Sequence, residues 1–238
     1  ENSVIKPTTF DRPELSFNLR PTPANMDEAT LTGVLASIPA SFGINMSDFR
    51  RTNGIKTFSG ITFVPVVNGR HSLLDTRDLV ETLLGRNSTG IYSGKPPNGF
   101  NQRQWENIKR KDAERFKKNE LVALVTTKAF GMGIDKPNIR WITHYGLPSS
   151  MESYYQEVGR AGRDSKPSHC YLILSEFDQE RNRELLSLDR DVEDLQTDFP
   201  WSERDDVTTA IYFHVGSFPG IENEVTHLHS MFNSLQPG

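Results

Sequence analysis

The sequence contains very little cysteine and no long apolar segment. Cys170 is the only cysteine among 238 residues, which excludes an intramolecular disulfide and any zinc site built on four cysteines. No apolar run approaches the roughly 18 residues that a membrane-spanning helix needs. The first 20 residues lack the basic-then-apolar order of a signal peptide. We therefore expect a cytoplasmic protein with no membrane partner.

Charge is distributed unevenly along the chain. Hydrophobic residues make up 35% of the sequence and charged residues 24%, which suits one globular domain with an appendage. The formal net charge is -4, but residues 176–206 alone hold 12 acids and 4 bases, so the rest of the chain carries +4. The acidity is therefore local, and it does not argue against nucleic-acid binding by the remainder.

Short apolar runs alternate with amphipathic ones from about residue 60. The run Leu121 to Thr126 is continuously apolar, as expected of a parallel strand that is buried on both faces. The alternation predicts an α/β fold with a mainly parallel sheet and helices on both faces. We expect strands at 61–64, 90–92, 121–126, 139–145 and 170–174, and helices at 72–84, 102–118 and 151–158.

The two ends of the chain are less regular. Residues 1–58 contain five prolines and one predicted helix, from Asp27 as N-cap to Ile38, followed by a polar loop or insertion at about 39–57. After Ser175 an acidic helical stretch is expected, then a break at Pro200, a strand at 210–215, a turn and a helix at 221–235. We predict a domain over 1–177 and an appendage of unknown role over 178–238, together forming a piece of a longer protein.

Two motifs carry the chemistry. Thr126 to Pro137 follows the best strand, and its glycines permit close approach of the backbone to a ligand. Gln156 to Asp164 ends a short helix and contains Arg160 and Arg163, whose planar, permanently charged guanidinium groups suit phosphate. Since ligands gather at the carboxyl ends of strands in an open parallel sheet, we expect both motifs at that edge. Each motif alone also fits a structural or salt-bridged turn.

Together and in this order, the two motifs resemble the fifth and sixth signature motifs of superfamily 2 helicases. The resemblance is closest to the RecQ family, and it is carried by Ala129 to Arg140, His144 and Ser153 to Asp164. It extends over about Phe10 to Phe177, with Phe10 to Phe17 resembling the strand that opens the family's domain. The resemblance implies the second of two RecA-like motor domains, of the P-loop NTPase type, in an ATP-dependent DNA helicase.

The resemblance also implies roles at a nucleotide. No Gly-x-x-x-x-Gly-Lys-[Ser/Thr] loop occurs here, so ATP with magnesium is expected to bind mainly to a first RecA-like domain of the same polypeptide. Arg163 would act as the arginine finger, with Arg160 as its companion. Gln156, Gly133 and Asp135 would lie near the nucleotide. We expect the chain alone to be inactive.

Single-stranded DNA is the implied macromolecular partner, which would associate a bacterial member with the nucleoid. Thr127, Lys128, Ser93 and Gly94 are the favoured contacts to its phosphate backbone. A basic helix offers further contacts, although its interleaved acids also fit a solvated charged face. Its basic residues are Arg103, Lys109, Arg110, Lys111, Lys117 and Lys118, and its acids are Glu106, Asp112 and Glu114.

The chain departs from the family pattern in several places. Arg70 stands for the arginine of the fourth motif, and Tyr92 takes the place of a histidine. The zinc-binding subdomain that commonly follows is excluded by the lack of cysteines, so no zinc is expected. His227 and His229 are alternate residues of a predicted helix and point apart, so no metal site is expected there. Trp105, Trp141 and Trp201 are expected to be core or interface residues.

Two alternative functions stay open at this stage. The chain could be a non-catalytic nucleic-acid or protein interaction module, with the acidic tail binding a protein partner. It could instead belong to a translocase of a restriction or defence system. The arginine pair at Arg160 and Arg163 favours the helicase motor.

Overall fold

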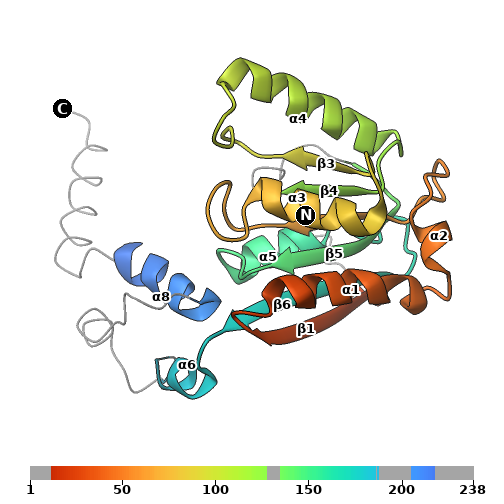
Figure 1. Ribbon diagram of the computed structural model, residues 1–238. Helices are drawn as coiled ribbons and strands as arrows, with labels where there is room; N and C mark the ends of the chain where they lie inside the picture. Colours follow the sequence, from red (N-terminus) through yellow and green to blue (C-terminus); the bar gives the residue numbers. More distant parts are fainter. Residues whose placement is uncertain (1–11, 128–134, 186, 188–204, 218–238) are drawn as a thin grey trace, which may run out of the picture. The chain divides into compact units, whose positions relative to one another are not determined.

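A computed structural model describes residues 12–127, 135–185, 187 and 205–217 (Figure 1). The chain divides into two compact units, Glu1–Ser175 and Glu176–Gly238. The first unit contains a six-stranded sheet. The described part of the second contains the helices α6 (Gln179–Leu185) and α8 (Asp206–Ser217).

The sheet has the strand order β1-β6-β5-β2-β4-β3. Strand β2 lies between β4 and β5 and pairs with both in parallel, and the pairs β3–β4 and β5–β6 are parallel as well. This arrangement confirms the predicted α/β class. The strands are β1 (Leu15–Pro23), β2 (Ser59–Phe63), β3 (Thr89–Tyr92), β4 (Ala123–Thr126), β5 (Ile139–Tyr145) and β6 (Ser168–Glu176).

In the described part of the first unit, five helices connect or cover these strands. Four of them begin at a polar cap: the side chains of Asn45, Ser72, Asn101 and Ser150 each accept a hydrogen bond from a backbone N–H of the first turn. The caps at Ser72, Asn101 and Ser150 belong to helices that the sequence predicted. The helices are α1 (Asp27–Ser41), α2 (Met46–Phe49), α3 (Leu73–Leu84), α4 (Gln102–Lys117) and α5 (Met151–Val158).

Each face of the sheet has its own apolar core. One core combines residues of α1 and α3 with Trp105 and Trp141, and the other combines Val158 of α5 with Phe116 and Ile142. Trp141 and Ile142 are neighbours in β5 that point to opposite faces, as strand geometry requires. Helices therefore cover both faces, as predicted. Trp105 and Trp141 are fully buried, which confirms them as core residues.

Gly60 in β2 makes room for the largest side chain of β5. A Cβ atom at Gly60 would lie 1.8 Å from Cε2 of the Trp141 ring, a distance that no real contact allows. The indole N–H donates to the carbonyl of Phe58 at 3.0 Å, which fixes the ring across the strand. Glycine is therefore required at position 60 by packing.

Three predictions for the N-terminal part are corrected. The region 39–57 is more than a polar loop, because it contains α2, whose Phe49 is fully buried with its ring centroid 6.0 Å from that of Trp141. The N-cap of α1 is Met26, whereas Asp27 is the first helical residue and directs its carboxylate to Arg70 and His71.

The opening strand begins at Leu15 and continues to Pro23, beyond Phe17, where the resemblance to the family's first strand ended.

In the second unit the predicted strand at 210–215 is wrong, because these residues belong to α8. The helix starts from a cap at Asp205, whose Oδ1 accepts from the backbone N–H of Thr208 at 2.8 Å while the Thr208 hydroxyl accepts from the N–H of Asp205 at 2.8 Å. This local cap starts a helix that continues through the residues predicted as a strand. The predicted helix at 221–235, Pro200, Trp201, His227 and His229 lie outside the described residues.

Candidate functional site

The turn that follows α5 lies where β5 begins. The backbone N–H of Gly162 donates to the carbonyl of Ile139, the first residue of β5, at 3.0 Å. Helix α5 connects the parallel strands β5 and β6 and must run back against their direction, so its C-terminal end returns to the amino edge of the sheet. The prediction that Gln156 to Asp164 lies at the carboxyl edge is therefore wrong.

The same edge brings the two sequence motifs together. Arg163 Nη1 lies 3.0 Å from Asp135 Oδ1, which joins the end of the first motif to the end of the second. Both side chains reach solvent, with 39% of the Arg163 side chain and 86% of the Asp135 side chain exposed. The pair therefore lies at the surface, where a ligand can approach the guanidinium group.

A second ion pair fixes the turn just beyond Arg163. Arg140 in β5 donates from Nη1 to Asp164 Oδ1 at 2.9 Å and from Nη2 to the other carboxylate oxygen. The Arg140 side chain is only 9% exposed, so its charge depends on this bidentate partner. The hydrogen bonds from Arg140 hold the pKa of Asp164 below its ordinary value. Asp164, which directly follows Arg163, is thereby tied to the start of β5.

The turn itself requires glycine at position 162. Gly162 has a φ of +64°, and a Cβ atom there would lie 2.8 Å from Cγ of Glu14. On the same side, Arg12 donates to the carbonyl of Ala161 at 3.0 Å. The backbone between the two arginines is thus packed closely against the start of β1.

Arg160 and Arg163 differ in their access to solvent. Arg160 is 7% exposed; burial and the nearby positive charge of Arg163 lower its pKa, against the opposing effect of Glu157. Glu157 in turn lies 2.8 Å from Nε2 of the buried His144 in β5. Arg163 is therefore the arginine that faces outward, and Arg160 lies behind it.

The other predicted nucleotide residues are Gln156, Asp135 and Gly133, of which the structure describes the first two. Gln156 is exposed in the last turn of α5, and Asp135 is the partner of Arg163 described above. Gly133, like the DNA candidate Lys128, lies outside the described residues.

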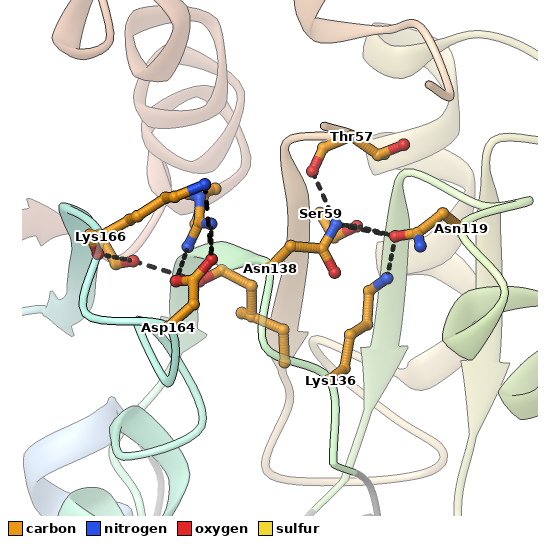
Figure 2. A network of polar contacts seen from close by, with 10 residues as sticks. Thr57, Ser59, Asn119, Lys136, Asn138, Asp164 and Lys166 are labelled. Carbon is orange, nitrogen blue, oxygen red and sulfur yellow. Dashed lines mark hydrogen bonds and ion pairs between the residues drawn. The ribbon is translucent and has the colours of Figure 1, made fainter. Parts of the chain in front are cut away.

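A buried polar network next to Asp135 was missed from the sequence (Figure 2). Residues 135–138 alternate between exposed and buried, so that Lys136 and Asn138 point inward. Lys136 Nζ donates to Asn119 Oδ1, and Asn138 Nδ2 donates to the same oxygen at 2.8 Å and to the carbonyl of Thr57 at 3.0 Å. Pro137 was the available signal, because the residue before proline favours extended backbone and thus strand-like alternation.

The described DNA candidates, Thr127, Ser93 and Gly94, lie at the opposite, carboxyl edge. Thr127 follows β4 and its N–H donates to the carbonyl of Tyr92 at 3.2 Å, which brings it beside the loop that contains Ser93 and Gly94. Gly94 is exposed. Ser93 is fully buried and its hydroxyl donates to the carbonyl of Lys95, so this side chain stabilises the loop instead of facing outward.

Helix α4 uses part of its charge internally. Lys109 lies 2.7 Å from Glu106 and sits over the ring of Tyr92, and Asp112 accepts from the backbone N–H of Ile91 at 3.0 Å. Lys109 and Asp112 are therefore engaged within the unit. The remaining basic residues of the predicted set are exposed: Arg103, Arg110, Lys111, Lys117 and Lys118.

Arg70, the candidate for the arginine of the fourth motif, is bound by other residues of the first unit. It pairs with Asp27, donates to the carbonyl of Ala24 and lies 3.4 Å from the hydroxyl of Ser175. Two absences apply to the described residues alone: no three metal-ligating side chains cluster there, and no helix there is long and apolar enough to cross a membrane.

The sequence is similar to parts of known helicases. Residues 76–165 match the helicase conserved C-terminal domain. Over 73 residues the chain is 52% identical to the ATP-dependent DNA helicase RecQ of Bacillus subtilis, covering 31% of this chain and 12% of that protein. Over 91 residues it is 46% identical to the human ATP-dependent DNA helicase Q4, covering 38% and 7%. The matches therefore span only a small part of these relatives.

Among solved structures, the chain is similar to the E. coli DEAD-box protein SrmB, crystallised with the regulator of ribonuclease activity A. The identity is 16%, the match covers 70% of this chain and 80% of the other, and the TM-score is 0.46.

Proposed function

We propose that this chain, which carries the conserved C-terminal domain of a RecQ-like helicase, is the second RecA-like motor domain of an ATP-dependent DNA helicase. It would complete an ATP site whose phosphate-binding loop lies in a first motor domain. The observation that carries the proposal is the Arg163–Asp135 pair, which unites the two signature motifs at an exposed edge.

The residues at the amino edge fit the phosphates of ATP. A nucleotide bound to the facing domain supplies magnesium and a γ-phosphoryl group whose negative charge is spread over its oxygens during transfer. Arg163 presents a partly exposed guanidinium group, which can donate two hydrogen bonds to such oxygens. The pair with Asp135 orients this group, and Arg160 adds positive charge from a less solvated position. Arg163 is thus the proposed arginine finger.

The carboxyl edge fits the backbone of a single DNA strand. Gly94 is an exposed glycine whose backbone can be approached closely, and Thr127 lies beside that loop. The first motif begins at this edge with Thr126, the last residue of β4, and its Asp135 lies near the opposite edge, where β5 begins. One segment therefore joins the proposed DNA edge to the proposed nucleotide edge, which supports coupling between them.

The simplest experiment separates the two domains. The present chain alone should hydrolyse no ATP, with or without single-stranded DNA, and its addition to the purified first motor domain should restore DNA-stimulated turnover. Measurable hydrolysis by a clean preparation of this chain would contradict the proposal, since it would require a complete ATP site here. Arg163→Ala in the added chain is the matched control, and it should abolish the restoration.

A further inference from the structure

Lys136 is a lysine in an unusual environment. Lys136 is only 2% exposed. Its ammonium group lies 5.0 Å from the centre of the Phe116 ring and donates a hydrogen bond to Asn119 Oδ1. Its described partners are thus an amide oxygen and an aromatic face. Burial lowers the pKa of Lys136 to about 8. A buried amine of this kind is costly, and ionisable groups in such environments cluster at functional sites.

The network around Lys136 joins the starts of three strands. Asn119 precedes β4, Thr57 and Ser59 lie at the start of β2, and Asn138 precedes β5. Asn119 Oδ1 accepts from Lys136, from Asn138 at 2.8 Å and from Ser59 Oγ at 3.5 Å, so one amide oxygen collects donors from two strand starts. Figure 2 shows Lys136 and Asn138 converging on Asn119. The chain from 136 to 138 is therefore anchored to the amino edge of the sheet.

This anchor acts directly on Asp135. Pro137 restricts Lys136 to extended backbone, in which neighbouring side chains point in opposite directions. With the Lys136 side chain held inward, the Asp135 side chain must point outward, where it is 86% exposed and meets Arg163. The inward position of Lys136 and the outward position of Asp135 are two results of one constraint.

We propose that Lys136 is a positioning residue for the arginine finger. Its buried ammonium, held by Asn119 and Phe116, fixes the backbone that presents Asp135 to Arg163. This inference rests on the proposed role of Arg163 and adds a buried residue that acts on it through Asp135. Lys136 itself does not reach the nucleotide. It sets the direction from which the guanidinium group approaches.

The test uses the full-length helicase and three variants. Lys136→Met keeps the aliphatic stem and removes the charge and the hydrogen bonds. Asn119→Gly removes the amide acceptor and tolerates the backbone φ of +60° at this position. Lys56→Met is the control, because Lys56 is an exposed lysine near the same edge. For each protein we would measure kcat and KM for ATP at saturating single-stranded DNA, DNA affinity and the thermal unfolding midpoint.

We expect kcat of Lys136→Met and Asn119→Gly to fall by about 10- to 100-fold, the scale for a small displacement of a catalytic group. KM for ATP and DNA affinity should stay within about twofold of the wild-type values, since the lost interaction acts on the transition state. In an Arg163→Ala background, Lys136→Met should cause little further loss of kcat, because Lys136 acts on catalysis through Arg163 and that side chain is already removed. Lys56→Met should behave as wild type.

The possible failures are distinct. Wild-type kcat in Lys136→Met and Asn119→Gly, with a lowered unfolding midpoint, would overturn the positioning role and leave a structural one. A full additional loss from Lys136→Met in the Arg163→Ala background would overturn it as well. Wild-type turnover in Arg163→Ala alone would overturn the proposed function itself. If Lys136→Met does not fold, Asn119→Gly decides the matter by the same criteria.

Discussion

Arg163 Nη1 lies 3.0 Å from Asp135 Oδ1, although 28 residues separate the two in the sequence. The contact exists because α5 runs back to the edge of the sheet where β5 begins. It gives the arginine that faces solvent a carboxylate that orients it. The contact therefore connects the fold to the proposed chemistry.

Asp135→Asn should separate orientation from stability. A solvent-exposed ion pair contributes at most about 1 kcal/mol, so the free energy of unfolding should hardly change. DNA-stimulated ATP turnover of the full-length helicase should nevertheless fall, because Arg163 loses the carboxylate that orients it. The control is Glu152→Gln, which removes an exposed carboxylate from the first turn of α5. Equal turnover in Asp135→Asn and Glu152→Gln would show that the pair is incidental.

Asp164→Asn should have the opposite profile, with a large effect on stability. Arg140 would keep a nearly buried guanidinium group without its carboxylate, at a cost of about 3 kcal/mol, the lower end for a broken buried pair. Urea denaturation at neutral pH measures this loss. A loss below about 1 kcal/mol, as for a surface pair, would contradict the structural role assigned to Arg140 and Asp164.

The same pair predicts a dependence on pH. Hydrogen bonds from Arg140 lower the pKa of Asp164 below its ordinary value of 3.8 in the folded protein. The stabilisation is thus present above that value and is lost as the pH falls through the lowered pKa. The difference in unfolding free energy between wild type and Asp164→Asn should therefore shrink in acid. A constant difference down to the lowest pH at which the wild type folds would contradict this.

Much of the fold could be predicted because its signals are local. Strand β5 and helix α5 have the predicted bounds, and Ser72 marks the start of α3 as its N-cap. The strand predicted at 210–215 is wrong because the cap formed by Asp205 and Thr208 starts a helix that runs through these residues. A short polar cap fixes only one turn, but it decides which structure begins there.

The candidate site was predicted only in part. Arg163 and Asp135 were candidates from the sequence and the structure pairs them, but the expectation that ligand-binding motifs lie at the carboxyl ends of strands placed Gln156 to Asp164 at the wrong edge of the sheet. A helix between two parallel strands must run back to the amino edge of the sheet, so the correct edge could have been derived from the predicted order of β5, α5 and β6. Lys136 was missed because a lysine in a polar motif suggests solvent exposure, and its burial depends on Asn119 and Phe116, which belong to another part of the chain.

Lys136 should give the protein a distinctive stability in mildly alkaline solution. Burial lowers its pKa from 10.5 to about 8 in the folded state. The unfolded chain therefore binds more protons between these values, so the contribution of Lys136 to stability rises with pH across that interval, by up to about 3 kcal/mol. Lys136→Met lacks this rise, and urea denaturation at both ends of the interval should show it. Parallel pH profiles for the two proteins would contradict a buried, titrating Lys136.

Gly60→Ala and Gly33→Ala should have effects of opposite sign. A methyl group at Gly60 would overlap the Trp141 ring, so we expect a loss of about 3 kcal/mol or more, at the upper end for overpacking. Gly33 lies in α1 with no atom within 4 Å of an added Cβ, so alanine there should stabilise by about 0.5–1 kcal/mol. Thermal or urea unfolding of the two variants measures both. A tolerated Gly60→Ala would contradict the packing of Trp141 across β2.

The most direct test of the central claim is the rate of ATP hydrolysis by full-length Arg163→Ala at saturating single-stranded DNA. If Arg163 is the arginine finger, kcat should fall by about 10³-fold or more, with DNA affinity and the unfolding midpoint essentially unchanged. Arg163→Lys should stay strongly impaired, because an ammonium cannot donate the bidentate pair of hydrogen bonds. Near-normal turnover in Arg163→Ala would contradict the account.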